Sequence, residues 1–390
     1  MTSMLQIKEA VRMMRRTRHV RRKGFREYDG DAEEICESII EDCFDAKRKY
    51  FRTSNGNFCE FYMRDFAFCC EALVSLGYVQ EVEETLRYAL ERFRIHESVE
   101  GAISPDGVPF TFPSYAPDSL ALLLYSLTHT KNRRLAVEYK SFLQSQINIF
   151  ARKVVDQRSL LPYAHKQFSS IRDHALRKAS CYDAVMIAVV AREAKALELK
   201  FPHEEQEVVA ALVKTYWNGT YFFADSTKQD IVVGDANVFP FWTSIITDTA
   251  MRENALNAMH AAGLDDPFPL RYVSKHDKKR ERVGLHIANL FARDYETDSI
   301  WMHLGLAYLR VLAEQDPETC RTHLAQYTKK IERHKTFLEI YDSQGEPFRR
   351  RFYVTDEGML WCANYLALQR ELAPGNSPES NPSSESDGKV

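Results

Sequence analysis

Apolar residues recur along most of the chain at intervals of three and four positions, the spacing of one helix face. Two kinds of predicted helix alternate. Helices of the first kind are charged along one face and are expected to face solvent: residues 31–48, 80–95, 132–155, 203–217, 248–262 and 316–334. Helices of the second kind are apolar nearly all round and are expected to be buried: residues 65–77, 118–129, 180–198, 235–246, 298–312 and 356–370.

This alternation predicts an all-α fold made of six helical hairpins. Such hairpins close most economically as an (α/α)6 barrel, a six-hairpin toroid in which the buried helices form the core. No period-two pattern is long enough to predict a sheet domain. Short β-hairpin excursions are expected in the loops, for example residues 220–224 with 231–233.

The loops of this predicted barrel are unequal. Those that lead from a solvent-facing helix into a buried one are long, whereas most of the opposite links are two to four residues. Long loops more often contain functional residues, and short ones only connect. The functional face is therefore expected at the end where the buried helices begin.

The two ends of the chain depart from the pattern. Residues 1–30 are basic and poor in core-forming positions, which predicts an arm or a leading helix before the barrel of residues 31–372. Residues 373–390 are rich in Pro, Ser, Asn and Glu, a composition that cannot bury enough apolar surface to fold, so a disordered tail is expected.

The composition of the chain argues against several classes of function. The net charge of −3 argues against a protein that coats nucleic acid or a membrane surface. There is neither a signal-peptide pattern nor a run of 18 apolar residues, so a soluble cytoplasmic protein is expected. The eight cysteines show no metal-site spacing and are expected to be reduced, mostly buried thiols, with no metal and no cofactor. Assembly into a homo-oligomer stays open.

Acidic residues gather where the buried helices begin. They are Asp65, Asp118, Asp183, Asp235, Asp298 and Asp356, with Asp173 and Glu339 in the preceding loops. For Asp118, Asp235, Asp298 and Asp356 the simplest interpretation is N-capping, because an aspartate oxygen accepts an unpaired backbone N–H at a helix start.

The pair Arg64-Asp65 is less easily explained as a cap, because aromatic residues surround it. Charged groups that bind hydroxyls, together with aromatic rings that stack on a sugar, are typical of carbohydrate sites. A carbohydrate is therefore one candidate partner, and ordinary packing of these aromatic residues in the core is the other interpretation. The candidates for substrate binding are Arg64, Asp65, Tyr62, Tyr115, Asp118 and Trp301.

Glu339 lies in an apolar run, between Leu338 and Ile340, that leads into a turn. A carboxylate in such a place is a candidate general base, since burial adjusts its pKa. The competing interpretation is a surface glutamate in a β-like connection.

Spaced segments from about residue 50 to 370 resemble the six-hairpin glycosidases, most closely the family 15 glucoamylase and trehalase-like hydrolases. The segment Tyr62-Met63-Arg64-Asp65-Phe66 is similar to the family's Arg-Asp segment, and the resemblance implies that Arg64 and Asp65 bind hydroxyls of the sugar that is cleaved. The segment Asp298-Ser299-Ile300-Trp301 looks like the barrel helix with a substrate-side tryptophan.

Two further segments of the resemblance bear on catalysis. Ser170-Ile171-Arg172-Asp173-His174 is similar to the segment of the general acid, although the family usually has Trp-Glu where this chain has Arg172-Asp173. Phe337-Leu338-Glu339-Ile340-Tyr341-Asp342 resembles the segment of the general base. The family's amino-terminal β-sandwich domain is not expected among these residues, which is a departure from the family's pattern.

The resemblance implies a glycoside hydrolase that cleaves an α-glucosidic bond of a small oligosaccharide or disaccharide with inversion. Asp173 would be the general acid and Glu339 the general base, about 6.5–9.5 Å apart as in other inverting enzymes. Asp173 has to stay protonated near neutral pH, so the positive charge of Arg172 is expected to point away from it.

Two alternatives remain open. Other sugar enzymes with this fold include uronyl hydrolases, phosphorylases and epimerases, and epimerases work with histidine pairs, for which His165, His174 and His303 are candidates. The change from Trp-Glu to Arg-Asp also fits a non-catalytic carbohydrate-binding scaffold.

Overall fold

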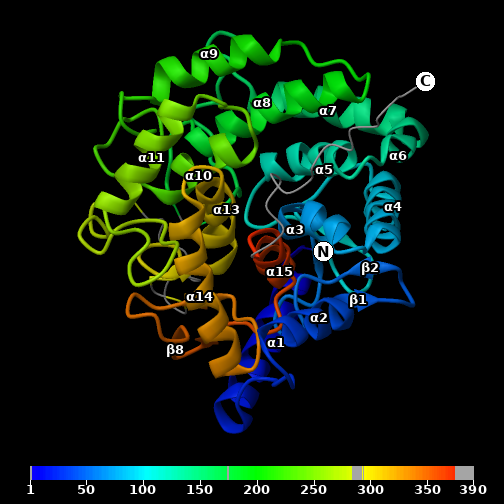
Figure 1. Cartoon of the computed structure of the whole chain (residues 1–390). Coiled ribbons are helices and arrows are strands. Elements are labelled where there is room, and N and C mark those ends of the chain that lie inside the picture. Colours follow the sequence, from blue (N-terminus) through cyan, green and yellow to red (C-terminus); the bar gives the residue numbers. More distant parts are fainter. Residues whose placement is uncertain (1, 174, 283–291, 293, 374–390) are drawn as a thin grey trace, which may run out of the picture.

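The computed structural model describes residues 2–173, 175–282, 292 and 294–373. Within these residues, six helices pack side by side in a ring (Figure 1). In chain order they are α3 (Met63–Ser75), α5 (Pro117–His129), α8 (Cys181–Ala196), α10 (Gly234–Trp242), α13 (Met302–Ala313) and α15 (Cys362–Glu371). Each packs against the next, and α15 packs against α3, so the last of these inner helices closes the ring onto the first.

A second set of helices lies outside this ring (Figure 1). It consists of α2 (Ala32–Cys43), α4 (Val79–Ile95), α6 (Arg133–Glu138), α7 (Lys140–Val154), α9 (Glu205–Tyr216), α11 (Thr249–Ala261) and α14 (Pro317–His334). Most of them pack against the inner helix that precedes or follows them in the chain, and α2 packs against α15. The predicted helix 132–155 is divided into α6 and α7 at Tyr139.

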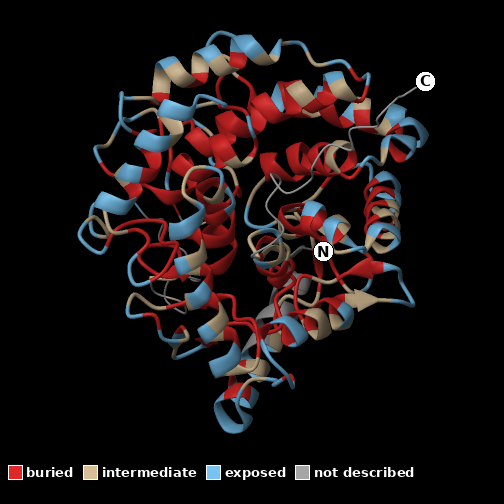
Figure 2. Cartoon of the chain, in the orientation of Figure 1, coloured by how far each residue is buried: buried red, intermediate tan, exposed pale blue. Residues whose placement is uncertain are grey.

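The burial pattern separates the two sets of helices (Figure 2). In α8, every residue from Cys181 to Ala191 is buried, which fits its apolar sequence. In α4 the buried residues follow helical spacing, while its charged residues face outward. Each fully buried Leu, Ile or Phe contributes about 1.5–3 kcal/mol, so the buried faces of both sets of helices stabilise the fold.

The strands that the structure describes are two residues long and lie in the loops: β1 (Phe44–Asp45), β2 (Tyr50–Phe51), β3 (Phe61–Tyr62), β4 (Ala102–Ile103), β5 (Pro109–Phe110), β6 (Ile300–Trp301), β7 (Ile340–Tyr341), β8 (Arg349–Arg350) and β9 (Tyr353–Val354). The pairs β1–β2, β3–β4, β4–β5, β6–β7 and β8–β9 are antiparallel. The predicted pairing of 220–224 with 231–233 does not form. Phe222 instead bridges to Trp217, and Asp225 to Ser180.

The basic residues at the amino end form one helix, α1 (Thr2–Lys23), which packs against β9. Thr17 and Val20 of this helix are buried, and Arg12 donates a hydrogen bond to Glu60 at 2.5 Å. The arm is therefore anchored on the helical body. Of the predicted disordered tail at 373–390, all but residue 373 lies outside the described residues.

The predicted capping role of four aspartates is wrong. The residues that cap α5 and α10 are Ala116 and Val233, so Asp118 and Asp235 lie inside the first turn. Both α13 and α15 begin later than predicted, which leaves Asp298 and Asp356 in the preceding loops. Each of the four is instead paired with a cation, and the respective partners are Arg64, Arg177, Lys278 and Arg16.

All eight cysteines are free, and seven of them are buried. This agrees with the expectation of reduced, buried thiols. As far as the chain is described, none of its helices combines the length and the apolar character that crossing a bilayer requires.

Candidate active site

The predicted site residues lie at one end of the ring, where the inner helices begin; we call this end the mouth. Arg64 and Asp65 are in the first turn of α3, Asp118 is in the first turn of α5, and Trp301 directly precedes α13. Glu339 directly precedes β7, which pairs with β6 in the register Trp301 to Ile340. The backbone N–H of Met302 donates to the carbonyl of Glu339 at 3.2 Å, which fixes Glu339 beside the start of α13.

Arg64 and Asp118 form an ion pair at the mouth, with 2.9 Å between Nε and Oδ2. The hydroxyl of Tyr182 donates to the same oxygen at 3.2 Å. Burial raises the pKa of Asp118, while the charge of Arg64 opposes this shift. The Arg64 side chain is 23% exposed and that of Asp118 is fully buried, so Asp118 orients Arg64 and Arg64 faces outward.

Asp65 accepts a hydrogen bond from Nε1 of Trp361 at 3.0 Å. Burial raises the pKa of Asp65 to about 6, while the charge of Arg64 and then the hydrogen bond from Trp361 limit the rise. Asp65 is therefore mostly ionised at neutral pH and can accept hydrogen bonds from a hydroxylated ligand.

Asp173 lies in the long loop before α8, and three contacts fix this loop. Ser170 donates to Asp183 in the first turn of α8. Arg172 is held by Glu281, with 3.1 Å between Nη1 and Oε1, and by the carbonyl of Glu296 at 2.6 Å. The guanidinium lies over the ring of Tyr272, 5.0 Å from its centroid, so Arg172 is engaged by Glu281 and the ring beside it.

The environment of Asp173 favours its protonated form. Its backbone N–H donates to Oε1 of Glu296 at 3.2 Å, and its Oδ1 has no hydrogen-bond partner among the described residues. Burial first, and then the negative charge of Glu296, raise the pKa of Asp173 to about 8, while Arg64 opposes the shift. A protonated carboxyl with an unpartnered oxygen at the mouth is suited to proton donation.

Glu339 is fully buried and accepts three hydrogen bonds. The hydroxyl of Tyr295 donates to Oε1, and Oε2 accepts from the hydroxyl of Tyr353 at 2.5 Å and from the backbone N–H of Asp356 at 3.0 Å. Burial first, and then the charge of Asp356, raise the pKa of Glu339 to about 7, while the two tyrosines oppose the shift. Glu339 therefore changes charge close to neutral pH, as a general base requires.

Aromatic rings connect the surroundings of Glu339 to those of Asp173. Trp301 packs edge-on against Tyr295 with centroids 4.6 Å apart, and its Nε1 donates to the carbonyl of Tyr295 at 2.7 Å. The ring of Trp301 also lies 5.8 Å from that of Tyr272, the ring beneath Arg172. Trp301 thus contacts one aromatic neighbour of Glu339 and one aromatic neighbour of Arg172.

Tyr62 and Tyr115 lie less centrally than the other candidates. Tyr62 is in β3, with its ring 5.6 Å from Phe58. The ring of Tyr115 packs 6.4 Å from Phe168, and Lys153 of α7 lies over it at 4.9 Å. Both rings flank the loops around the mouth rather than the cluster around Trp301.

The histidines that would serve an epimerase do not form a pair where the structure describes them. His165 is exposed and packs on Tyr163, whereas His303 is buried and bonded to the hydroxyl of Tyr272 at 3.1 Å. Burial lowers the pKa of His303 well below its usual value, so its ring is neutral. His174 lies outside the described residues.

Sequence reasoning missed Tyr295, Tyr353 and Glu296, which surround the two candidate carboxylates. Their positions, 44 and 14 residues from Glu339 for the two tyrosines, follow no local period. The fold alone brings them together. The nearest sequence signal is the aromatic content of the long loops.

Cavities also occur away from the mouth. One of about 660 Å³ lies at the outer surface, between the β1–β2 turn and α4, and is lined mostly by charged residues. Another of about 250 Å³ lies between the inner helices, mainly along the later parts of α3, α13 and α15, with His303 in its wall. Neither cavity is lined by Asp173 or Glu339. The candidate site is therefore defined by the carboxylates at the mouth and not by these cavities.

Comparison with known proteins identifies the fold. No protein-family model and no curated protein sequence matches the chain. Solved structures do match, and they include a glycosidase variant in complex with glucose, which has a TM-score of 0.64 at 13% identity over 94% of this chain and 98% of that one. A rhamnosidase from Klebsiella oxytoca with rhamnose bound matches with a TM-score of 0.61 at 11% identity, over 88% of this chain and 65% of that chain.

A third match is the family 63 mannosylglycerate hydrolase from Thermus thermophilus in complex with Tris. Its TM-score is 0.56 at 11% identity, over 87% of this chain and 100% of that chain. At such identities the likeness shows the fold alone. The chain thus shares a helical fold with several glycosidases of different named substrates.

Proposed function

We propose that the protein is a glycoside hydrolase on an (α/α)6 barrel, and that Asp173 and Glu339 are its general acid and general base. The observation that supports this most directly is the pair of raised pKa values at one end of the helix ring, about 8 for Asp173 and about 7 for Glu339. Between these values the first group is protonated and the second ionised, the states in which an acid and a base act.

In this proposal Asp173 gives its proton to the glycosidic oxygen as the bond to the anomeric carbon breaks. Glu339 takes a proton from a water molecule that attacks the opposite face of the sugar, which inverts the anomeric centre. Tyr295 and Tyr353 hold the carboxylate of Glu339 in one orientation by donating to it. Arg64 and Asp65 bind hydroxyls, and the ring of Trp301 stacks against the sugar.

We further propose that the substrate is an α-glucoside of disaccharide or short oligosaccharide size, as for the glucoamylase and trehalase-like enzymes that the sequence resembles. The glucose in the glycosidase structure with a similar fold is consistent with this choice. Rhamnosides and mannosylglycerate, chosen from the names of the other similar structures, are alternative substrates to include in a test.

The test is hydrolysis of a panel of disaccharides and glycosides, followed by release of the monosaccharide. Asp173→Asn and Glu339→Gln are each expected to lower kcat by about 10²–10⁴-fold without loss of helical content. Asp29→Asn, which changes an exposed aspartate, is the matched control and should keep full activity. Retained hydrolysis by Asp173→Asn would refute the assignment, and binding without turnover by the unsubstituted protein would indicate a scaffold instead.

A further inference from the structure

The basic helix α1 reaches the candidate base through one side chain, Arg16. Its Nη2 lies 3.1 Å from Oδ1 of Asp356, and it also contacts the carboxylate of Glu357. The same guanidinium donates to the carbonyls of Val354 at 3.3 Å and Thr355 at 3.2 Å. The side chain is only 11% exposed, so this contact is part of the interior and not a surface pair.

Asp356 is fully buried and is surrounded by donors. It accepts from the hydroxyl of Ser54 and from the backbone N–H groups of Asn57 at 2.7 Å and Phe58 at 3.0 Å. These donors are neutral. Among the described residues that contact this carboxylate, Arg16 is the one that has a positive charge.

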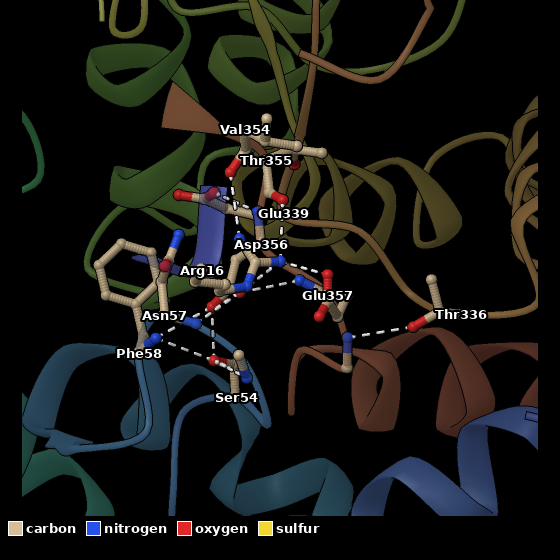
Figure 3. Close-up of polar contacts among 12 residues, drawn as sticks. Arg16, Ser54, Asn57, Phe58, Thr336, Glu339, Val354, Thr355, Asp356 and Glu357 are labelled. Carbon is tan, nitrogen blue, oxygen red and sulfur yellow. Dashed lines mark hydrogen bonds and ion pairs between the residues drawn. The ribbon is translucent and has the colours of Figure 1, made fainter. Parts of the chain in front are cut away.

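The backbone of Asp356 is joined to Glu339 in both directions. Its N–H donates to Oε2 of Glu339 at 3.0 Å, and its carbonyl accepts from the N–H of Glu339 at 3.0 Å. Figure 3 shows Arg16 and Glu339 next to Asp356, although Arg16 comes from a distant part of the chain. Removing the positive charge of Arg16 would therefore leave the negative charge of Asp356 unbalanced directly beside Glu339.

We propose that α1 is a part of the active site, and that Arg16 favours the ionised form of Glu339 by balancing the negative charge of Asp356. The role of Glu339 as a base rests on the proposed function, but the charge relationship among the three residues does not. Arg16 is a positioning residue here, because it acts on the base through Asp356.

The other groups around Glu339 do not replace Arg16. Tyr295 and Tyr353 donate through neutral hydroxyls whose pKa values are raised by burial. Glu357 shares Arg16 with Asp356, and burial raises the pKa of Glu357 to about 7. Any negative charge on Glu357 adds to that of Asp356, and Arg16 is the cation that balances both carboxylates.

The experiment measures the protonation of Glu339 directly, without a substrate. Full-length protein is labelled with ¹³C at the glutamate carboxyl carbons, and the Glu339 signal is assigned from its absence in Glu339→Gln and followed against pH. Arg16→Met is expected to raise the pKa of Glu339 by about one unit, because an uncompensated like charge disfavours ionisation. Arg16→Lys, which keeps the charge, should remain near the original value.

Two matched variants separate this effect from a general disturbance of α1. Arg21→Met changes an exposed arginine of the same helix, which donates to the carbonyl of Arg350, and should leave the titration unchanged. Asp356→Asn should lower the pKa of Glu339, and adding Arg16→Met to it should then have little effect. This second result supports the proposal even if Arg16→Met alone does not fold.

An unchanged Glu339 titration in folded Arg16→Met, or in Asp356→Asn, would overturn the inference. Activity on the glycoside panel distinguishes this from failure of the proposed function. Hydrolysis without a shift in the titration would contradict the inference only. A shift without hydrolysis by any form of the protein would support the charge relationship and contradict the hydrolase proposal.

Discussion

The indole N–H of Trp361 donates a hydrogen bond to Oδ1 of Asp65 across 3.0 Å, and this contact joins residues 296 positions apart in the chain. Asp65 belongs to the first turn of α3, and Trp361 directly precedes α15. The contact therefore lies where the ring of inner helices closes, and it also orients one of the proposed sugar-binding carboxylates.

Trp361→Phe should weaken substrate binding more at low pH than at high pH. The N–H of Trp361 holds down the pKa of Asp65, which burial raises to about 6. Without the donor more of Asp65 is protonated, so KM is expected to rise by roughly 3–10-fold at pH 6 and less at pH 8. Steady-state kinetics at both values test this. Trp217→Phe, on the outer side of the fold beside Phe222, is the control, and an equal KM change in both variants would contradict the prediction.

The pH dependence of kcat/KM should be a narrow bell. Activity is expected to rise through pH of about 7 as Glu339 ionises and to fall through about 8 as Asp173 loses its proton. Glu296→Gln removes a charge that raises the pKa of Asp173, so the alkaline limb should move to lower pH while the acid limb stays in place. A rate that is constant from pH 6 to pH 9 would exclude this pair as acid and base.

Glu339→Gln should stabilise the protein at alkaline pH relative to acid pH. The folded-state pKa of Glu339, about 7, is above the ordinary value of 4.5, so its contribution to stability is complete below the lower value and is lost as pH rises through the higher one. Glutamine does not ionise and avoids this loss.

The expected gain in unfolding free energy for Glu339→Gln is on the order of 2–3 kcal/mol. The measurement is urea unfolding of both proteins at pH 5 and pH 8. The free energy of unfolding of the variant should rise relative to that of the parent only at pH 8. Asp29→Asn serves again as the exposed control. The prediction is wrong if the difference between the two proteins is the same at both pH values.

Arg64→Met should destabilise the fold strongly, because it leaves Asp118 fully buried without its cation. Breaking a buried pair on one side costs about 3–5 kcal/mol in unfolding free energy. Adding Asp118→Asn should recover a large part of the loss. For comparison, Arg87→Met breaks exposed pairs with Glu83 and Glu138 and should change stability by at most about 1 kcal/mol. Equal losses of unfolding free energy in Arg64→Met and Arg87→Met would contradict the claim that burial makes the Arg64–Asp118 pair the more important one.

Much of the helical arrangement was predictable because the distribution of apolar and charged residues along a helix reflects which of its faces are buried. The apolar run around Leu122 and Leu123 fits a helix buried on all sides, and the charged face of α4 fits one at the surface. Boundaries were less predictable. Residues 356–361 look helical by composition, but the buried Asp356 is engaged by Arg16, and the helix begins only at Cys362.

The aspartates show most clearly what sequence alone cannot supply. An aspartate at a predicted helix start has a local explanation, capping, which needs no knowledge of the rest of the chain. The true partners of Asp118 and Asp235 are Arg64 and Arg177, which are distant in sequence and come near only in the fold. Asp173 and Glu339 could be proposed as candidates from their segments, but their tyrosine and glutamate neighbours could not.

The ring that α15 closes onto α3 has a consequence for how the chain is made. A ribosome produces α3 long before α15, so the flank of α3 that packs on α15 finds its partner only after all the intervening helices have been synthesised. Until then an apolar surface stays open to water, and such surfaces promote aggregation of nascent chains. Production of this protein in cells is therefore expected to depend on chaperones that act during translation.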